Sequence, residues 1–82
     1  MKVYVHPSAE KHGISEDEVV KLWSLAWRFV PRYSDELLAL SNYNNKDYEL
    51  IAKVVGVDEY LVFHCFTPPT KKFLDEIFRK GY

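Results

Sequence analysis

The sequence has little glycine and proline, a single cysteine and no long apolar run. With 3 glycines and 4 prolines in 82 residues, it contains no flexible linker of the kind that separates domains. Cys65 has no partner for an internal disulfide, and its apolar neighbours in VFHCF predict a small buried side chain in a reducing compartment. No apolar run approaches the roughly 18 residues that span a bilayer, and the N-terminus MKVYVHPS lacks the apolar region of a signal peptide. We therefore expect one cytoplasmic domain over residues 1–82, with no membrane partner.

An excess of charge of one sign is also missing. Eleven Lys and Arg stand against 12 Asp and Glu, which gives a net charge of −1. A protein that binds nucleic acid through many phosphates usually carries excess positive charge, so any such role must rest on a local patch. A DNA-binding regulator is disfavoured further by the lack of a helix pair with a basic recognition helix. Aromatic residues are abundant, at 16%, which predicts a ring-rich core.

Familiar catalytic and cofactor motifs are absent. The chain has no glycine-rich nucleotide loop, no paired cysteines, no zinc-protease motif and no serine-hydrolase elbow, so we expect no cofactor. A metal site made by His6, His12 and His64 is disfavoured, because a six-residue spacing turns the first pair about 120° apart on a helix. General acid-base catalysis needs none of these motifs and stays open.

The first half of the chain predicts a strand followed by a helix. Residues 2–5 read as an edge strand, and residues 8–12 as one helical turn that Gly13 closes. The spacing of Ser15 and Glu18 is typical of a capping box, which begins a mostly buried helix that continues through residue 30 and stops at Pro31. Trp23 and Trp27 both fall on its apolar stripe, and we expect both in the core rather than in a base-stacking role.

The second half predicts three strands and a closing helix. The strand-like runs cover residues 35–42, 48–56 and 59–66, separated by turns at 44–45 and 56–58, so they form an antiparallel meander. Thr67 or Thr70 caps the closing helix and Gly81 ends it. Its solvated face carries two predicted pairs, Lys71 with Asp75 and Lys72 with Glu76. The predicted fold class is α+β, a small two-layer domain with both helices on one face of the sheet.

Six basic residues are candidates for a site. His64 interrupts an apolar strand, where it is either a hydrogen-bonded sheet histidine or a general acid or base. Lys11 and His12 precede Gly13 and a helix start, where His12 either closes the turn or joins Lys11 in holding a phosphate. Arg28 and Arg32 flank Pro31 at the predicted helix end, where they either cap the helix or contact a substrate. Lys72 opens the closing helix.

The segment EKHGISEDEV, followed downstream by a hairpin and by HCFTPPTKKFL, resembles BrnT-like toxins of bacterial type II toxin-antitoxin systems and their uncharacterised relatives. The resemblance implies a RelE-like fold and RNA cleavage that stops translation and is blocked by a cognate antitoxin. It implies that Lys11, His12 and His64 are catalytic, and that Lys72 and, as a weaker match, Arg32 contact substrate. Arg28 is a candidate substrate contact from its predicted place at the helix end alone. The toxins usually carry arginines around their last two strands, whereas this chain has none there before Arg79.

Two functions therefore stand. The first is a metal-independent ribonuclease toxin, whose partners are an antitoxin and RNA. The second is a non-catalytic module of the same fold that binds a protein through a sheet edge or an aromatic surface, with a second copy of the chain as one candidate partner. Convergence of Lys11, His12, Arg32 and His64 in one cleft favours the ribonuclease, and their dispersal favours the binding module.

Overall fold

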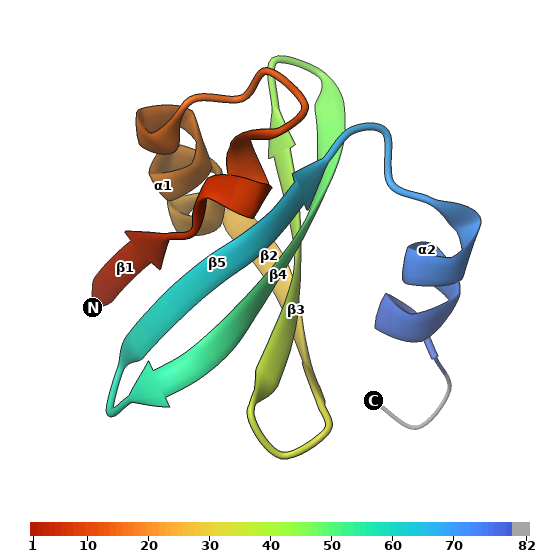
Figure 1. Cartoon of the computed structure of the whole chain (residues 1–82). Coiled ribbons are helices and arrows are strands. Elements are labelled where there is room, and N and C mark those ends of the chain that lie inside the picture. The colour runs from red at the N-terminus through yellow and green to blue at the C-terminus, as the bar shows by residue number, and fades with distance from the viewer. Residues whose placement is uncertain (80–82) are drawn as a thin grey trace.

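The computed structural model describes residues 1–79 as five strands, two α-helices and a short 3₁₀-helix (Figure 1). The predicted helix end at Gly81 lies outside these residues. The three predicted meander strands are confirmed within two residues at each end. In chain order the elements are β1 (Lys2–Val5), η1 (Pro7–Glu10), α1 (Glu16–Ser24), β2 (Ala26–Arg32), β3 (Glu36–Tyr43), β4 (Lys46–Gly56), β5 (Glu59–Phe66) and α2 (Lys71–Ile77).

All five strands form one mixed sheet in the order β1-β5-β4-β3-β2. The four strands from β2 to β5 are antiparallel neighbours, and β1 adds in parallel beside β5. The β3–β4 turn has positive φ at Asn44 and Asn45, as predicted, and Asp58 supplies a positive φ in the β4–β5 turn. Gly13 also has a positive φ, at the predicted turn before α1.

Helix α1 begins as the sequence predicts and ends earlier. The Ser15 hydroxyl accepts the backbone N–H of Glu18, and the Glu18 carboxylate accepts the N–H of Ser15, which completes the capping box. The helix stops at Ser24, so the predicted continuation to residue 30 is wrong. Residues 26–32 form β2 instead, an antiparallel edge strand beside β3.

Pro31 and Trp27 both lie in β2, and neither has the position that the expected helix gave it. Proline is tolerated on an edge strand, which needs ladder bonds on one side only, so Pro31 lies within β2 rather than ending a helix. A bulge between Ala26 and Arg28 displaces Trp27 from the ladder. Trp27 is 58% exposed and its ring lies 6.0 Å from that of Phe78, so its predicted core position is wrong.

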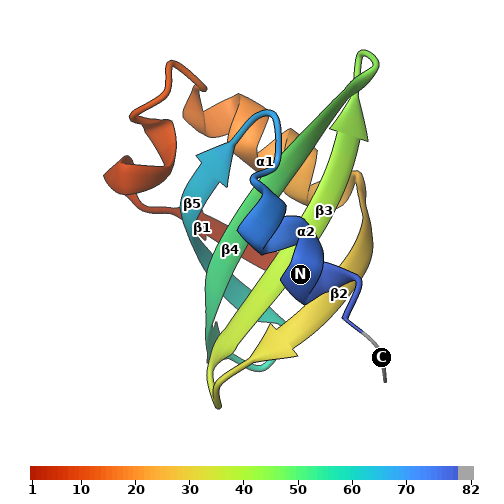
Figure 2. The same cartoon turned by 90° about the vertical axis from the view of Figure 1, so that its right-hand side faces the viewer.

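The two helices cover opposite faces of the sheet, as Figures 1 and 2 show. Helix α1 packs on one face through Val19, Leu22 and Trp23, and α2 packs on the other through Phe73 and Ile77. The fold is therefore α+β, as predicted, but the two-layer arrangement is wrong, because the sheet is the middle of three layers. On the α2 face the register aligns three rows across β2, β3 and β4: Arg28, Leu40 and Glu49; Val30, Leu38 and Ile51; Arg32, Glu36 and Lys53.

Helix α2 is capped by Thr70, whose hydroxyl accepts the backbone N–H of Phe73. The predicted ion pair of Lys71 with Asp75 is present at 3.8 Å. The predicted ion pair of Lys72 with Glu76 is not present among residues 1–79. The Glu76 carboxylate points toward Arg32 of β2 instead.

Cys65 lies in the core on the α1 side, 1% exposed, as predicted. Burial raises the pKa of its thiol to about 12, and the carboxylates of Glu18 and Glu49 add to the rise. The thiolate is therefore scarce at neutral pH, and Cys65 serves as a packing residue rather than a nucleophile.

Candidate functional site at the end of strand β5

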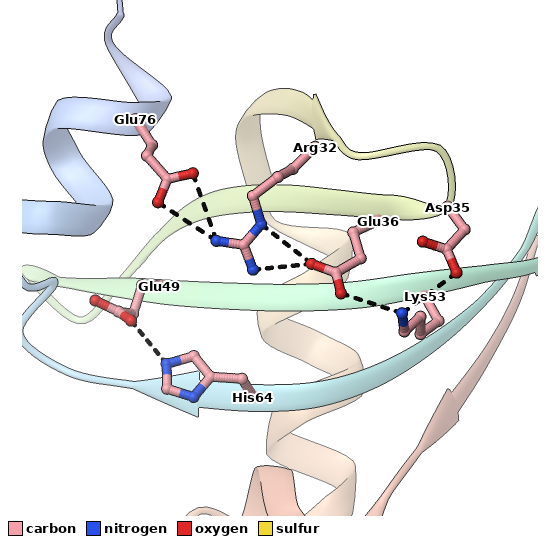
Figure 3. A network of polar contacts seen from close by, with 7 residues as sticks. All are labelled: Arg32, Asp35, Glu36, Glu49, Lys53, His64 and Glu76. Atoms are coloured by element: carbon pink, nitrogen blue, oxygen red, sulfur yellow. Dashed lines mark hydrogen bonds and ion pairs between the residues drawn. The ribbon is translucent and has the colours of Figure 1, made fainter.

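A histidine and a buried carboxylate meet near the end of β5, where the chain enters the loop that leads to α2. Strand pairing places Ile51 opposite His64 and Glu49 opposite Phe66, so His64 and Glu49 lie on the same face, on neighbouring strands. The Nε2 atom of His64 lies 2.7 Å from Oε2 of Glu49 (Figure 3). The His64 side chain is 31% exposed and that of Glu49 only 6%, so solvent reaches the imidazole but hardly reaches the carboxylate.

Glu49 also anchors the start of α2. Its second oxygen accepts the backbone N–H of Thr70 at 2.6 Å. Both carboxylate oxygens are thus hydrogen-bonded, as a buried acid requires. Because an ionised carboxylate only accepts, the neutral ring of His64 carries its proton on Nε2 and presents Nδ1 as an acceptor. The arrangement of carboxylate, imidazole and free nitrogen is that of an oriented general base.

His12 and Lys11 lie on the loop beside the same end of β5. The His12 ring packs edge-on with the ring of Phe66, with centroids 4.7 Å apart. Both His12 and Lys11 are exposed, and Lys11 makes no ion pair within residues 1–79. The turn itself is closed by backbone bonding, since Gly13 donates its N–H to the carbonyl of Glu10. His12 is therefore not required for the turn.

Arg28 and Arg32 hold α2 against the sheet. Nε of Arg28 donates to the carbonyl of Ile77 at 2.6 Å, at the C-terminal end of the helix, where a cation is favoured. Nη1 of Arg32 contacts the Glu76 carboxylate at 3.4 Å. Each arginine thus contacts α2 directly, and Glu49 holds the N-terminal end of this helix through Thr70. These three polar contacts fix α2 over the apolar row of Val30, Leu38 and Ile51.

Arg32 belongs to an ion-pair network that crosses three strands (Figure 3). Its guanidinium donates twice to Oε1 of Glu36, at 2.8 and 3.1 Å, and Lys53 contacts Oε2 of Glu36 at 3.2 Å. Burial opposes charge on Arg32, but the carboxylates of Glu36 and Glu76 outweigh it and raise the pKa of the guanidinium. Hydrogen bonds to Glu36 and Asp35 raise the pKa of Lys53.

We expect Glu36→Gln to lower the free energy of unfolding by about 2 kcal/mol near neutral pH, because it weakens two charge-assisted contacts at once. Burial alone would raise the pKa of Glu36, but hydrogen bonds from Arg32 and Lys53 outweigh it and lower the pKa. The stabilisation is therefore present above the ordinary value of 4.5 and is lost as the pH falls through the lowered value. Urea titrations near neutral pH and at about pH 3 measure the change.

The difference between wild type and Glu36→Gln should shrink in acid, and a difference that is constant across this range contradicts the proposed origin. The matched control is Asp75→Asn, which removes the exposed pair with Lys71. Its effect should stay within about 0.5 kcal/mol at either pH, because exposed ion pairs contribute little.

The predicted site residues divide into two groups. His64, His12 and Lys11 lie around the end of β5, and Lys72 lies in the first turn of α2, two residues after Thr70. Arg32 lies three strands from His64, roughly 14 Å across the sheet, and lines a separate surface pocket with Tyr33 and Glu76. Three of the four residues of the predicted cleft, Lys11, His12 and His64, lie near one end of β5, which favours the ribonuclease. The separate position of Arg32 favours the binding module.

Glu49 is the residue of this candidate site that the sequence analysis does not identify. It stands in an otherwise apolar stretch, YELIA, where a charged residue between buried neighbours must have a partner. This pattern indicates from sequence alone that Glu49 has a polar partner, but only the β4–β5 register identifies the partner as His64.

Comparison with known protein families, with curated proteins and with solved structures finds no match to this chain. Within residues 1–79, no helix is long and apolar enough to cross a lipid bilayer.

Proposed function

We propose that the chain is the toxin of a type II toxin-antitoxin pair and cleaves RNA without a metal ion. The observation that carries the proposal is the His64–Glu49 dyad, an accessible imidazole oriented by a buried carboxylate. The resemblance of EKHGISEDEV and HCFTPPTKKFL to BrnT-like toxins supplies the reaction class. The same resemblance supplies the expected partner, an antitoxin that blocks the site.

In the proposed reaction, Nδ1 of His64 takes the proton of a ribose 2′-hydroxyl. The 2′-oxygen forms a bond to the adjacent phosphorus, and the bond from phosphorus to the 5′-oxygen breaks, with water returning a proton to that oxygen. Lys11 and His12 bind the phosphate and stabilise the charge that develops on it. Glu49 holds the ring of His64 in the orientation and tautomer that the base needs.

Local charge supports an RNA site although the net charge does not. Lys11, His12 and Lys72 come from the two segments that flank the end of β5, and Glu49 is committed to internal bonds. Lys71 lies beside Lys72 but forms an ion pair with Asp75. Binding through so few cations predicts weak affinity for bulk RNA and a modest dependence on salt.

The test is induced expression in a bacterium of the wild type and of His64→Ala, with growth and total-RNA integrity measured at matched soluble yield. Arrest with RNA breakdown for the wild type alone supports the ribonuclease. Normal growth with intact RNA for both chains contradicts it. Co-expression with a candidate antitoxin that restores growth identifies the partner.

The second candidate is a non-catalytic protein-binding module, and an exposed apolar surface favours it. A pocket of about 240 Å³ on the α1 side is lined by Met1, Trp23, Phe29, Leu37 and Tyr60. Met1 is 67% exposed and Phe29 45%, which is typical of surfaces that a partner covers. Pro31 lacks the N–H that an added strand would use, so this surface is a better candidate than the β2 edge.

A further inference from the structure

An aromatic pair lies beside the dyad. Phe66 follows His64 by two residues on the same strand and face, which separates their backbones by about 7 Å. The rings of Phe66 and His12 meet at 71° with centroids 4.7 Å apart. Phe66 is half-buried and His12 is exposed, so the pair presents ring surface to solvent instead of filling the core.

We propose that His12 and Phe66 form a stacking site for the base of an unpaired nucleotide. This inference rests on the ribonuclease function proposed above, since it assigns the substrate class of the same site. A nucleobase held on the pair brings the phosphate of the same nucleotide toward His64. The substrate is then single-stranded RNA or a loop, because bases within a duplex have no free face to stack on a side chain.

The surroundings of the pair fit a nucleotide better than a purely structural role. Neither ring is required by its backbone segment, because the 11–13 turn closes through the N–H of Gly13 and the backbone of Phe66 is held by its pairing with Glu49 of β4. Lys11 precedes His12 and has no ion-pair partner among residues 1–79, so it is available to a phosphate. Stacking on an aromatic ring tolerates any base, which predicts little sequence preference from this contact.

The test measures binding of a short single-stranded 2′-O-methyl oligoribonucleotide, which lacks the attacking hydroxyl, by fluorescence anisotropy. Phe66→Leu and His12→Ala should each weaken binding about ten-fold, because stacking on one aromatic ring contributes that much. Phe66→Trp should retain wild-type affinity. Tyr33→Leu is the matched control, since Tyr33 is 80% exposed and lies at the other end of β2 from this site. The same oligonucleotide in a duplex should bind at least ten-fold more weakly.

Wild-type affinity for both Phe66→Leu and His12→Ala overturns the stacking site, as does equal binding of the single strand and the duplex. Because His12 is exposed, its variant tests the proposal even if Phe66→Leu does not fold. RNA cleavage is measured separately on the wild type. If the wild type cleaves RNA and both variants bind the oligonucleotide as well as the wild type does, only the stacking site is overturned. If binding depends on Phe66 but the wild type does not cleave RNA, only the ribonuclease function is overturned.

Discussion

If the chain is the proposed ribonuclease, His64→Ala should lower the rate of RNA cleavage by about 10²- to 10⁴-fold, the usual effect of removing a general base. The variant should remain folded, because His64 is 31% exposed and contributes one side-chain contact, to Glu49. Cleavage of a messenger RNA in a cell-free translation reaction measures the rate and covers both free and ribosome-bound substrate. The matched control is His6→Ala, since His6 is an exposed histidine that caps η1 and bonds Ser8.

Glu49→Gln tests the orientation and tautomer of the His64 imidazole while leaving the imidazole itself in place. The glutamine amide keeps an oxygen for the N–H of Thr70 but turns an N–H group toward His64. The ring then accepts through Nε2 and carries its proton on Nδ1, where it can no longer take a proton from substrate. We expect a loss of activity close to that of His64→Ala, with α2 still docked. Equal rates for wild type and Glu49→Gln contradict the assigned role of the dyad.

The sequence predicts the strands better than the layers. Turn residues and alternating patterns locate β3, β4 and β5 within two residues. Helical spacing fails at residues 25–30, because apolar positions at 23, 26, 27 and 30 fit a helix as well as a short edge strand with a bulge. The run LLAL at residues 37–40 carries the signal of three layers, since a continuous apolar strand is buried on both faces.

The sequence identifies single candidate residues but not their contacts. It marks His64, His12 and Lys11 as candidates, because basic residues interrupt a strand and a turn. The partnership of His64 with Glu49 spans 15 residues and depends on the bulge that shifts the β4–β5 register. The docking of Arg28 and Arg32 on α2 spans more than 40 residues and was equally hidden. Spacing along the chain cannot reveal contacts that only the sheet creates.

Replacement by alanine should lower the stability of the protein strongly at Trp23 and only slightly at Trp27. Trp23 is 2% exposed and packs against Phe29 and Tyr60, with ring centroids 5.4 Å apart in both pairs. Trp23→Ala removes this packing and leaves a cavity, so we expect a loss of about 3 to 5 kcal/mol in the free energy of unfolding. Trp27 is exposed on the β2 bulge, and Trp27→Ala should change the free energy by less than about 1 kcal/mol.

Urea titration followed by far-ultraviolet circular dichroism measures both effects without relying on the fluorophore that each variant loses. Because a domain of this size has only about 5 to 10 kcal/mol of stability, Trp23→Ala should lose a large part of it and unfold at a clearly lower temperature than the wild type, while Trp27→Ala unfolds close to the wild-type temperature. Iodide quenching gives an independent check, since the remaining tryptophan should be accessible in Trp23→Ala and protected in Trp27→Ala. Similar losses of stability at the two positions would mean that residues 25–30 continue the helix, with Trp27 in the core.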